Sequence, residues 1–150
     1  MSQYRHLLDE DDASRIEALE FASFIVEAPA GAGKTELLTQ RYLKLLATVD
    51  TPEEIIAITF TNKAASEMKK RIMDSLVDAN SGQRPSLPHK IVTFELGQKA
   101  LARSAEKSWE LLTTPSRLRI YTIDSLSGNL ARQMPLLSRF GTQPEVSEDA

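Results

Sequence analysis

Ala28-Pro29-Ala30-Gly31-Ala32-Gly33-Lys34-Thr35 is the stretch of sequence that decides the fold of this chain. An apolar run directly before it, Phe24-Ile25-Val26, predicts a buried strand over residues 24–27. The segment after it, residues 36–47, predicts a helix. A glycine-rich turn between a buried strand and a helix is typical of a phosphate-binding loop of the Walker A kind. Only the first position departs from the strict pattern, with Ala28 in place of glycine.

The loop predicts a site for a nucleoside triphosphate. Gly31 and Gly33 allow backbone N–H groups to approach phosphate oxygens, and the N-terminus of the following helix adds partial positive charge. Lys34 would reach the β- and γ-phosphates, and the Thr35 hydroxyl would complete the coordination shell of Mg²⁺. We therefore expect ATP and Mg²⁺ to bind here, with Lys34 and Thr35 as catalytic residues and Thr35 as metal ligand. The full predicted cofactor site is Ala28, Pro29, Ala30, Gly31, Ala32, Gly33, Lys34 and Thr35.

Strands and helices are predicted to alternate along the chain. Residues 9–22 read as an acidic helix, 62–77 as an amphipathic helix, 92–112 as a helix broken or bent near Gly97, and 124–133 as a short helix. Residues 55–60 and 118–123 read as strands. Because residues 55–60 are almost all apolar or β-branched, we expect a parallel strand that is covered on both faces. The order strand, helix, strand predicts an α/β fold with a parallel sheet flanked by helices.

Apolar positions at helical spacing predict which faces are buried. In the helix after the loop they are Leu38, Tyr42, Leu45 and Leu46, and in the helix over residues 62–77 they are Ala64, Ala65, Met68, Ile72 and Leu76. Trp109 is expected in the core or as a lid over it.

Composition places the chain among globular cytoplasmic proteins. Of its 150 residues, 41% are hydrophobic and 26% charged, the net charge is −3, and cysteine is absent. No apolar run is long enough to cross a bilayer, and the first residues lack the apolar core of a secretory signal, so no membrane partner is expected. The lack of cysteine excludes disulfides and thiolate metal sites. Motors built on such a loop need more elements than this length supplies, so we expect a fragment.

Two further strings follow the loop in a characteristic order. They are Thr59-Phe60-Thr61-Asn62-Lys63-Ala64-Ala65-Ser66-Glu67-Met68 and Tyr121-Thr122-Ile123-Asp124-Ser125-Leu126. Together with the loop, the chain resembles the UvrD/Rep-like superfamily 1 DNA helicases, whose motifs I, Ia and Ib these three strings match. Glu27 before the loop, Arg117-Leu118-Arg119-Ile120 and the third string are similar to the AddA/RecB-like recombination-repair branch.

This resemblance implies a RecA-like P-loop NTPase fold. Residues 1–150 would be the N-terminal portion of the first helicase motor domain, with the remaining motor motifs and a C-terminal motor domain beyond Ala150. It implies an ATP-dependent DNA helicase that translocates 3′–5′ on single-stranded DNA in double-strand break repair and recombination. A place near the nucleoid is implied as well, together with a nuclease domain or a partner nuclease-helicase subunit. This fragment alone is expected to hydrolyse ATP poorly, because an arginine finger can contribute ~10³–10⁵-fold to the rate.

The resemblance also implies contacts with single-stranded or double-stranded DNA. Phe60 follows a predicted strand, at the end where ligands of open α/β sheets bind, and could stack on a base or be a strand-end core residue. Thr61 and Asn62 could hold phosphate or sugar at a helix N-terminus. Lys63 is as consistent with a solvated surface charge as with a phosphate contact. The predicted DNA-binding residues are Phe60, Thr61, Asn62, Lys63, Thr122 and Ser125.

Two departures from the family pattern leave roles open. The family's adenine-contacting glutamine is not found around Ala13, Ser14 and Arg15, so the adenine contact is supplied by Arg15 or its neighbours, or is lost. Asp124 stands where many relatives have histidine, and a carboxylate repels phosphate. It could instead cap its helix.

Asp124 supports a rival interpretation. An apolar strand that ends in a carboxylate is the Walker B arrangement, so the chain could be a complete small P-loop enzyme with Asp124 as metal ligand. Ser125 stands where motors place the acidic residue that orients water. A third possibility is a non-catalytic nucleotide-binding module.

Overall fold

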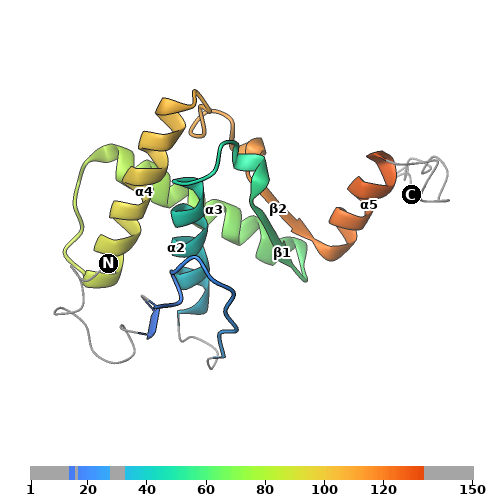
Figure 1. Ribbon diagram of the computed structural model, residues 1–150, viewed down its shortest axis with the longest axis horizontal. Helices are drawn as coiled ribbons and strands as arrows, with labels where there is room; N and C mark the ends of the chain where they lie inside the picture. The colour runs from blue at the N-terminus through green and yellow to red at the C-terminus, as the bar shows by residue number, and fades with distance from the viewer. Residues whose placement is uncertain (1–13, 16, 28–32, 134–150) are drawn as a thin grey trace, which may run out of the picture.

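The computed structural model of this chain describes residues 14, 15, 17–27 and 33–133 (Figure 1). Its elements follow one another as a mixture of helices and two short strands. In order they are α2 (Lys34–Leu46), the one-turn helix η2 (Pro52–Glu54), β1 (Ile56–Thr59), α3 (Asn62–Ser81), α4 (Pro88–Glu106), the one-turn helix η3 (Pro115–Arg117), β2 (Arg119–Thr122) and α5 (Ile123–Gln133). This arrangement confirms a mixed helix and strand fold with a small parallel sheet.

The sheet formed by the described residues has two parallel strands, β1 and β2. Ile56 pairs with Arg119 and Thr59 with Thr122, with α3 and α4 lying between the two strands in sequence. The prediction that residues 55–60 are covered on both faces is wrong for the described part of the chain. Ile56 and Ile58 are 48% and 53% exposed, because the helices pack only against the opposite face.

Helices α2, α3 and α4 pack against one another and enclose the main core. Its most deeply buried members come from α2, α3 and the segment between α4 and β2, and include Leu43, Leu46, Ile72, Leu76, Trp109 and Leu111. Trp109 is therefore a core residue, and its indole N–H donates to the backbone oxygen of Asp50 at 3.1 Å. In α3 the predicted stripe is confirmed at Met68, Ile72 and Leu76.

The buried face of α2 differs from the predicted one. Tyr42 and Leu46 are buried as expected, but Leu38 is 52% exposed, and Leu37 and Leu43 are buried instead. Two packing partners explain the difference, because α2 contacts α3 and α4 on one side and the segment around Leu19 on another. Two buried surfaces widen the apolar stripe beyond a single row.

Helix α4 runs unbroken through Gly97, so the predicted break there is wrong. The glycine serves close packing against α3. An added Cβ at Gly97 would lie 2.9 Å from the Cβ atom of Ala79 and 3.1 Å from the backbone oxygen of Ser75. The lack of a side chain therefore lets the two helices approach each other.

The expected strand over residues 24–27 is not present in the described structure. Residues 23–27 have no regular secondary structure, and Ile25 is 92% exposed. A strand needs a neighbouring strand for its hydrogen bonds, and β1 and β2 pair with each other instead. The helix expected to reach residue 22 is shorter than predicted, because residues 18–22 form turns and bends.

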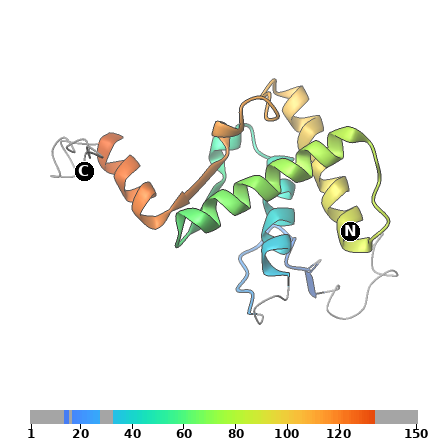
Figure 2. The same cartoon turned by 180° about the vertical axis from the view of Figure 1, so that it is seen from behind.

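Figures 1 and 2 show α5 extending away from the three packed helices, beyond the carboxyl ends of β1 and β2. None of its residues is buried. In both views the N-terminus of α2 and the ends of the two strands face the same side of the molecule. Within the described residues, no helix is long and apolar enough to cross a membrane.

A bidentate ion pair fastens β2 to the segment that leads into β1. Arg117 Nε donates to Glu53 Oε1 at 2.7 Å and Arg117 Nη2 donates to Glu53 Oε2 at 3.0 Å. The hydrogen bond from Arg117 lowers the pKa of the Glu53 carboxyl below its ordinary value of 4.5, against a smaller opposing effect of desolvation.

This ion pair predicts a pH dependence of stability. A carboxyl whose pKa is lowered by folding contributes stability above its unfolded pKa and loses it as the pH falls through the folded value. We expect Glu53→Gln to lower the free energy of unfolding by about 0.5–1 kcal/mol at pH 7. Urea titrations should show this difference shrinking below pH 4.5. A difference that stays constant down to about pH 3 would contradict the prediction. Asp74→Asn, in an exposed pair with Lys70, is the control.

Candidate functional site

The first candidate site surrounds the N-terminus of α2. Gly33 has a left-handed backbone conformation with φ of 78° and directly precedes the helix, which begins with Lys34 and Thr35. Both of these side chains are exposed. Since the first N–H groups of an α-helix have no acceptor inside it, an anion beside this end would meet backbone donors. Residues 28–32 of the predicted loop lie outside the described residues.

The described residues of this site suit a Mg²⁺-bound triphosphate. Thr35 offers a hydroxyl oxygen, which is a ligand type that Mg²⁺ prefers, and its backbone oxygen accepts a hydrogen bond from Thr39 Oγ1 at 2.9 Å. The hydrogen bond holds the first turn of α2 in place. Lys34 supplies the cationic side chain that a phosphate requires. Elsewhere in the described residues, no group of three or more His, Cys, Asp or Glu side chains could hold a metal ion.

Arg15 also lies at this site. An ideal Cβ added to Gly33 would be 2.6 Å from Arg15 Nη2 and 2.9 Å from Arg15 Nη1, so the guanidinium lies against the glycine. Any side chain at Gly33 would meet Arg15 and would be strained by the positive φ as well. Arg15 thus lies next to the start of α2, the position where a phosphate would bind.

Arg41 holds the segment before the loop against α2. Its guanidinium donates to the backbone oxygens of Ala18, Glu20 and Ala22, and it lies 5.4 Å from the centroid of the Phe24 ring. Three carbonyl groups directed at one side chain are incompatible with a continuing helix. Arg41 therefore explains why the predicted helix ends early.

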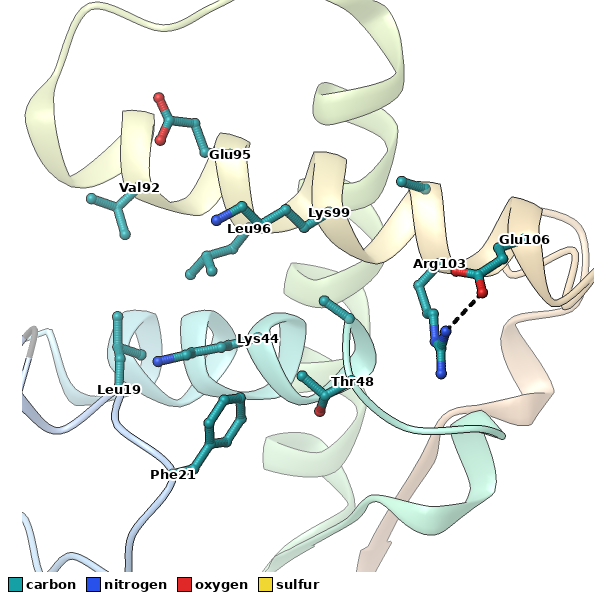
Figure 3. Close-up of a pocket in the computed structure, with 12 residues that line it drawn as sticks. Leu19, Phe21, Lys44, Thr48, Val92, Glu95, Leu96, Lys99, Arg103 and Glu106 are labelled. Carbon is teal, nitrogen blue, oxygen red and sulfur yellow. Dashed lines mark hydrogen bonds and ion pairs between the residues drawn. The ribbon is translucent and has the colours of Figure 1, made fainter. Parts of the chain in front are cut away.

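Next to this segment is an apolar cavity of about 520 Å³ between α2, α4 and residues 19–21 (Figure 3). Leu19 and Phe21 line one side, and Leu96 on α4 lines the other. Lys44 Nζ lies 4.7 Å from the centroid of the Phe21 ring. The lining residues include none of the residues predicted to bind a nucleotide or DNA.

The second candidate site is a cleft of about 880 Å³ at the carboxyl ends of β1 and β2. It brings together two of the motifs identified in the sequence, although about 60 residues separate them in the chain. Its lining residues are Phe60, Thr61, Asn62, Thr122, Asp124, Ser125, Gly128, Asn129 and Arg132. Five of the six predicted DNA-binding residues are on this surface.

Phe60 is the most exposed large aromatic side chain of the cleft, with 89% of its surface accessible. An aromatic ring in this position contributes nothing to the core, so the alternative that Phe60 is a strand-end core residue is wrong. Thr61 caps α3, and its Oγ1 accepts from the backbone N–H of Ala64 at 3.1 Å. Asn62 and Lys63 are exposed in the first turn of α3, and Lys63 does not line the cleft.

Thr122 and Ser125 form a reciprocal cap at the start of α5. The backbone N–H of Ser125 donates to Thr122 Oγ1 at 3.1 Å, and the backbone N–H of Thr122 donates to Ser125 Oγ at 2.9 Å. Because this pair caps the helix, the expectation that Asp124 is the cap is wrong. Asp124 lies in the first turn of α5 with its side chain exposed. Strand β2 ends at Thr122, so Asp124 is not at the strand end that a Walker B carboxylate occupies.

Sequence reasoning missed three lining residues, Gly128, Asn129 and Arg132. With Ser125 they follow the spacing i, i+3, i+4 and i+7, which places them on one face of α5. This spacing was visible in the sequence, but no resemblance attached a role to it.

Comparison with known proteins adds the family to this geometry. The model of the UvrD/REP helicase N-terminal domain matches residues 9–144, so the chain belongs to this family. It is 42% identical over 59 residues to an ATP-dependent helicase/nuclease of Clostridium acetobutylicum, a match covering 37% of this chain and 5% of that protein. It is 41% identical over 75 residues to the ATP-dependent DNA helicase PcrA of Staphylococcus aureus, covering 48% of this chain and 10% of that protein.

The chain therefore spans only a small part of the length of these relatives. No solved structure matches it.

Proposed function

We propose that this chain is the ATP-binding, N-terminal part of an ATP-dependent DNA helicase, and that its two candidate sites bind Mg·ATP and single-stranded DNA. The observation that carries the proposal is the cleft at the ends of β1 and β2. It joins residues 60–62 to residues 122–132, on the side of the molecule where α2 begins. A nucleotide and a strand bound at the same edge of one sheet could influence each other through β1, β2 and α2.

The cleft suits a ligand that is bound without reading its sequence. Every base has a flat face that can stack on Phe60, and such stacking contributes ~1–3 kcal/mol per base regardless of base identity. Asn62 and Asn129 add amide groups that can hydrogen-bond to phosphate or sugar oxygens. The small number of cations in the cleft favours modest electrostatic affinity, with stacking as the main contribution.

At the start of α2, Lys34 would neutralise charge on the β- and γ-phosphates and Thr35 would hold Mg²⁺ with the phosphate oxygens. Mg²⁺ supplies charge neutralisation across these oxygens when it is bound. Arg15, held against Gly33, adds a second cation beside the same phosphates. Adenine recognition by Arg15 is therefore less favoured than a phosphate contact, since its guanidinium lies at the phosphate end of the site.

We infer a wider role from the family. Residues 1–150 would form the first part of a RecA-like motor domain, with a second motor domain and a nuclease, in the same chain or in another, as its partners. The complete protein would couple ATP hydrolysis to 3′–5′ translocation in double-strand break repair, in the cytoplasm at the nucleoid. The Clostridium acetobutylicum relative is named a helicase/nuclease, which supports this inference.

The test measures binding of a fluorescent ATP analogue to the 150-residue chain, with and without Mg²⁺ and oligothymidylate, together with ATP turnover. We expect Mg²⁺-dependent binding with negligible DNA-stimulated turnover. Rapid turnover without DNA would instead support a complete small enzyme, and Asp124→Asn would then be the next variant. Absence of any nucleotide binding would contradict the proposal.

A further inference from the structure

One face of α5 carries features that neither helix stability nor packing explains. Ser125, Gly128, Asn129 and Arg132 form this face, and all four line the cleft opposite Phe60. Helix α5 has no buried residue, so its cleft face is not needed for the core. At about 1.5 Å per residue, the face from Ser125 to Arg132 is about 10 Å long.

Gly128 is the most informative residue of this face. Glycine inside a helix is destabilising relative to alanine, so its presence needs a reason. At Gly97 the reason is close packing, and at Gly33 and Gly82 it is a positive φ. Neither applies to Gly128, which has no positive φ and no atom within 4 Å of an added Cβ. Within the described residues nothing requires glycine here, which points to a ligand that comes close to the helix backbone.

Charge along the cleft has a direction. Its two charged lining residues are Asp124, in the first turn of α5, and Arg132, in the last turn. A phosphate would be repelled at the first position and attracted at the second. Asn129, one turn before Arg132, can donate a hydrogen bond to a phosphate or sugar oxygen.

We propose that this face of α5 is the second wall of the single-strand site. The sugar-phosphate backbone passes over Gly128 and places a phosphate at Arg132, while a base stacks on Phe60 on the opposite wall. This inference rests on the proposed function, and it assigns Gly128 and Arg132 to DNA binding.

The test compares Gly128→Ala and Arg132→Gln with wild type in binding fluorescent oligothymidylate by anisotropy over a series of salt concentrations. We expect Gly128→Ala to weaken binding roughly tenfold, because its methyl group occupies the space of the backbone. The same variant should raise the melting temperature, because alanine favours the helix. Arg132→Gln should weaken binding and reduce the slope of log K against log salt by about 0.7, as expected for one lost phosphate contact.

Two matched controls separate this from general effects. Ser127→Ala changes the same helix on another face, and Lys99→Gln removes an exposed cation from α4; both should bind like wild type. If wild type and both Gly128→Ala and Arg132→Gln bind equally while Phe60→Ala is impaired, the role of α5 is wrong and the proposed function survives. If wild type does not bind the oligonucleotide at all, both proposals are overturned.

Discussion

Replacing Lys34 by alanine is expected to weaken Mg²⁺-dependent ATP binding by at least about 100-fold. Lys34 is exposed at the first position of α2, beside Gly33 and the Arg15 guanidinium. Its ammonium group is the one predicted to bridge the β- and γ-phosphates, and loss of a close charge pair at a ligand costs about 2–5 kcal/mol. Titration with a fluorescent ATP analogue measures the effect.

Two observations make this prediction specific. Because Lys34 is exposed, its truncation should leave the melting temperature within about 2 °C of wild type, as surface substitutions have small effects. Lys44→Ala, in the last turn of the same helix, removes a cation of the same type away from the phosphate site and should bind ATP like wild type. Equal affinity of the Lys34 and Lys44 variants would contradict the nucleotide site.

The second large effect is expected at Phe60. Phe60→Ala should lower affinity for single-stranded DNA about 5–150-fold, because stacking on one base contributes ~1–3 kcal/mol. Phe60→Tyr should retain most of the affinity, since the aromatic face remains. Stability should not change, because the ring is 89% exposed.

Phe21→Ala provides the control for this prediction. Phe21 is also largely exposed, at 61%, but it lies beside the apolar cavity between α2 and α4. Its loss should leave DNA affinity unchanged. If the two variants bind oligothymidylate equally well in anisotropy titrations, Phe60 does not stack on a base.

Local signals predicted the helices and strands that the structure confirms. Hydrophobic periodicity located α2 and α3, and the apolar, β-branched runs located β1 and β2 to within two residues at each end. These elements are governed by patterns within a few turns of chain, which a single sequence contains. The motif strings predicted correctly that residues 60–62 and residues 122 and 125 would matter together, and the structure brings them to one cleft.

The failures have a different origin, because they depend on contacts between distant parts of the chain. Residues 24–27 have the composition of a strand, yet pairing partners decide whether a strand forms. Arg41 draws the carbonyls of residues 18–22 toward α2, which the helical pattern of that segment does not reveal. Gly97 suggested a break, but the close approach of Ala79 explains it. Neither Arg41 nor Gly97 differs in sequence alone from an ordinary surface arginine or a helix breaker.

At α5 the sequence contained the information, but its meaning required the cleft. Asp124 suggested a cap or a metal ligand because it follows an apolar run. The structure instead assigns the cap to Thr122 and Ser125. Capping by two hydroxyl groups leaves the carboxylate in the first helical turn, facing the same cleft as Phe60.

Ultraviolet cross-linking of the chain to oligothymidylate, followed by mass spectrometry of tryptic peptides, tests the central claim most directly. If a single strand occupies the cleft, adducts should fall on the peptide of residues 45–63, which contains Phe60, and on that of residues 120–132, which contains Ser125 and Asn129. Excess unlabelled oligothymidylate should remove both. Adducts confined to peptides of α4, such as residues 91–99, with none on the two cleft peptides, would contradict the account.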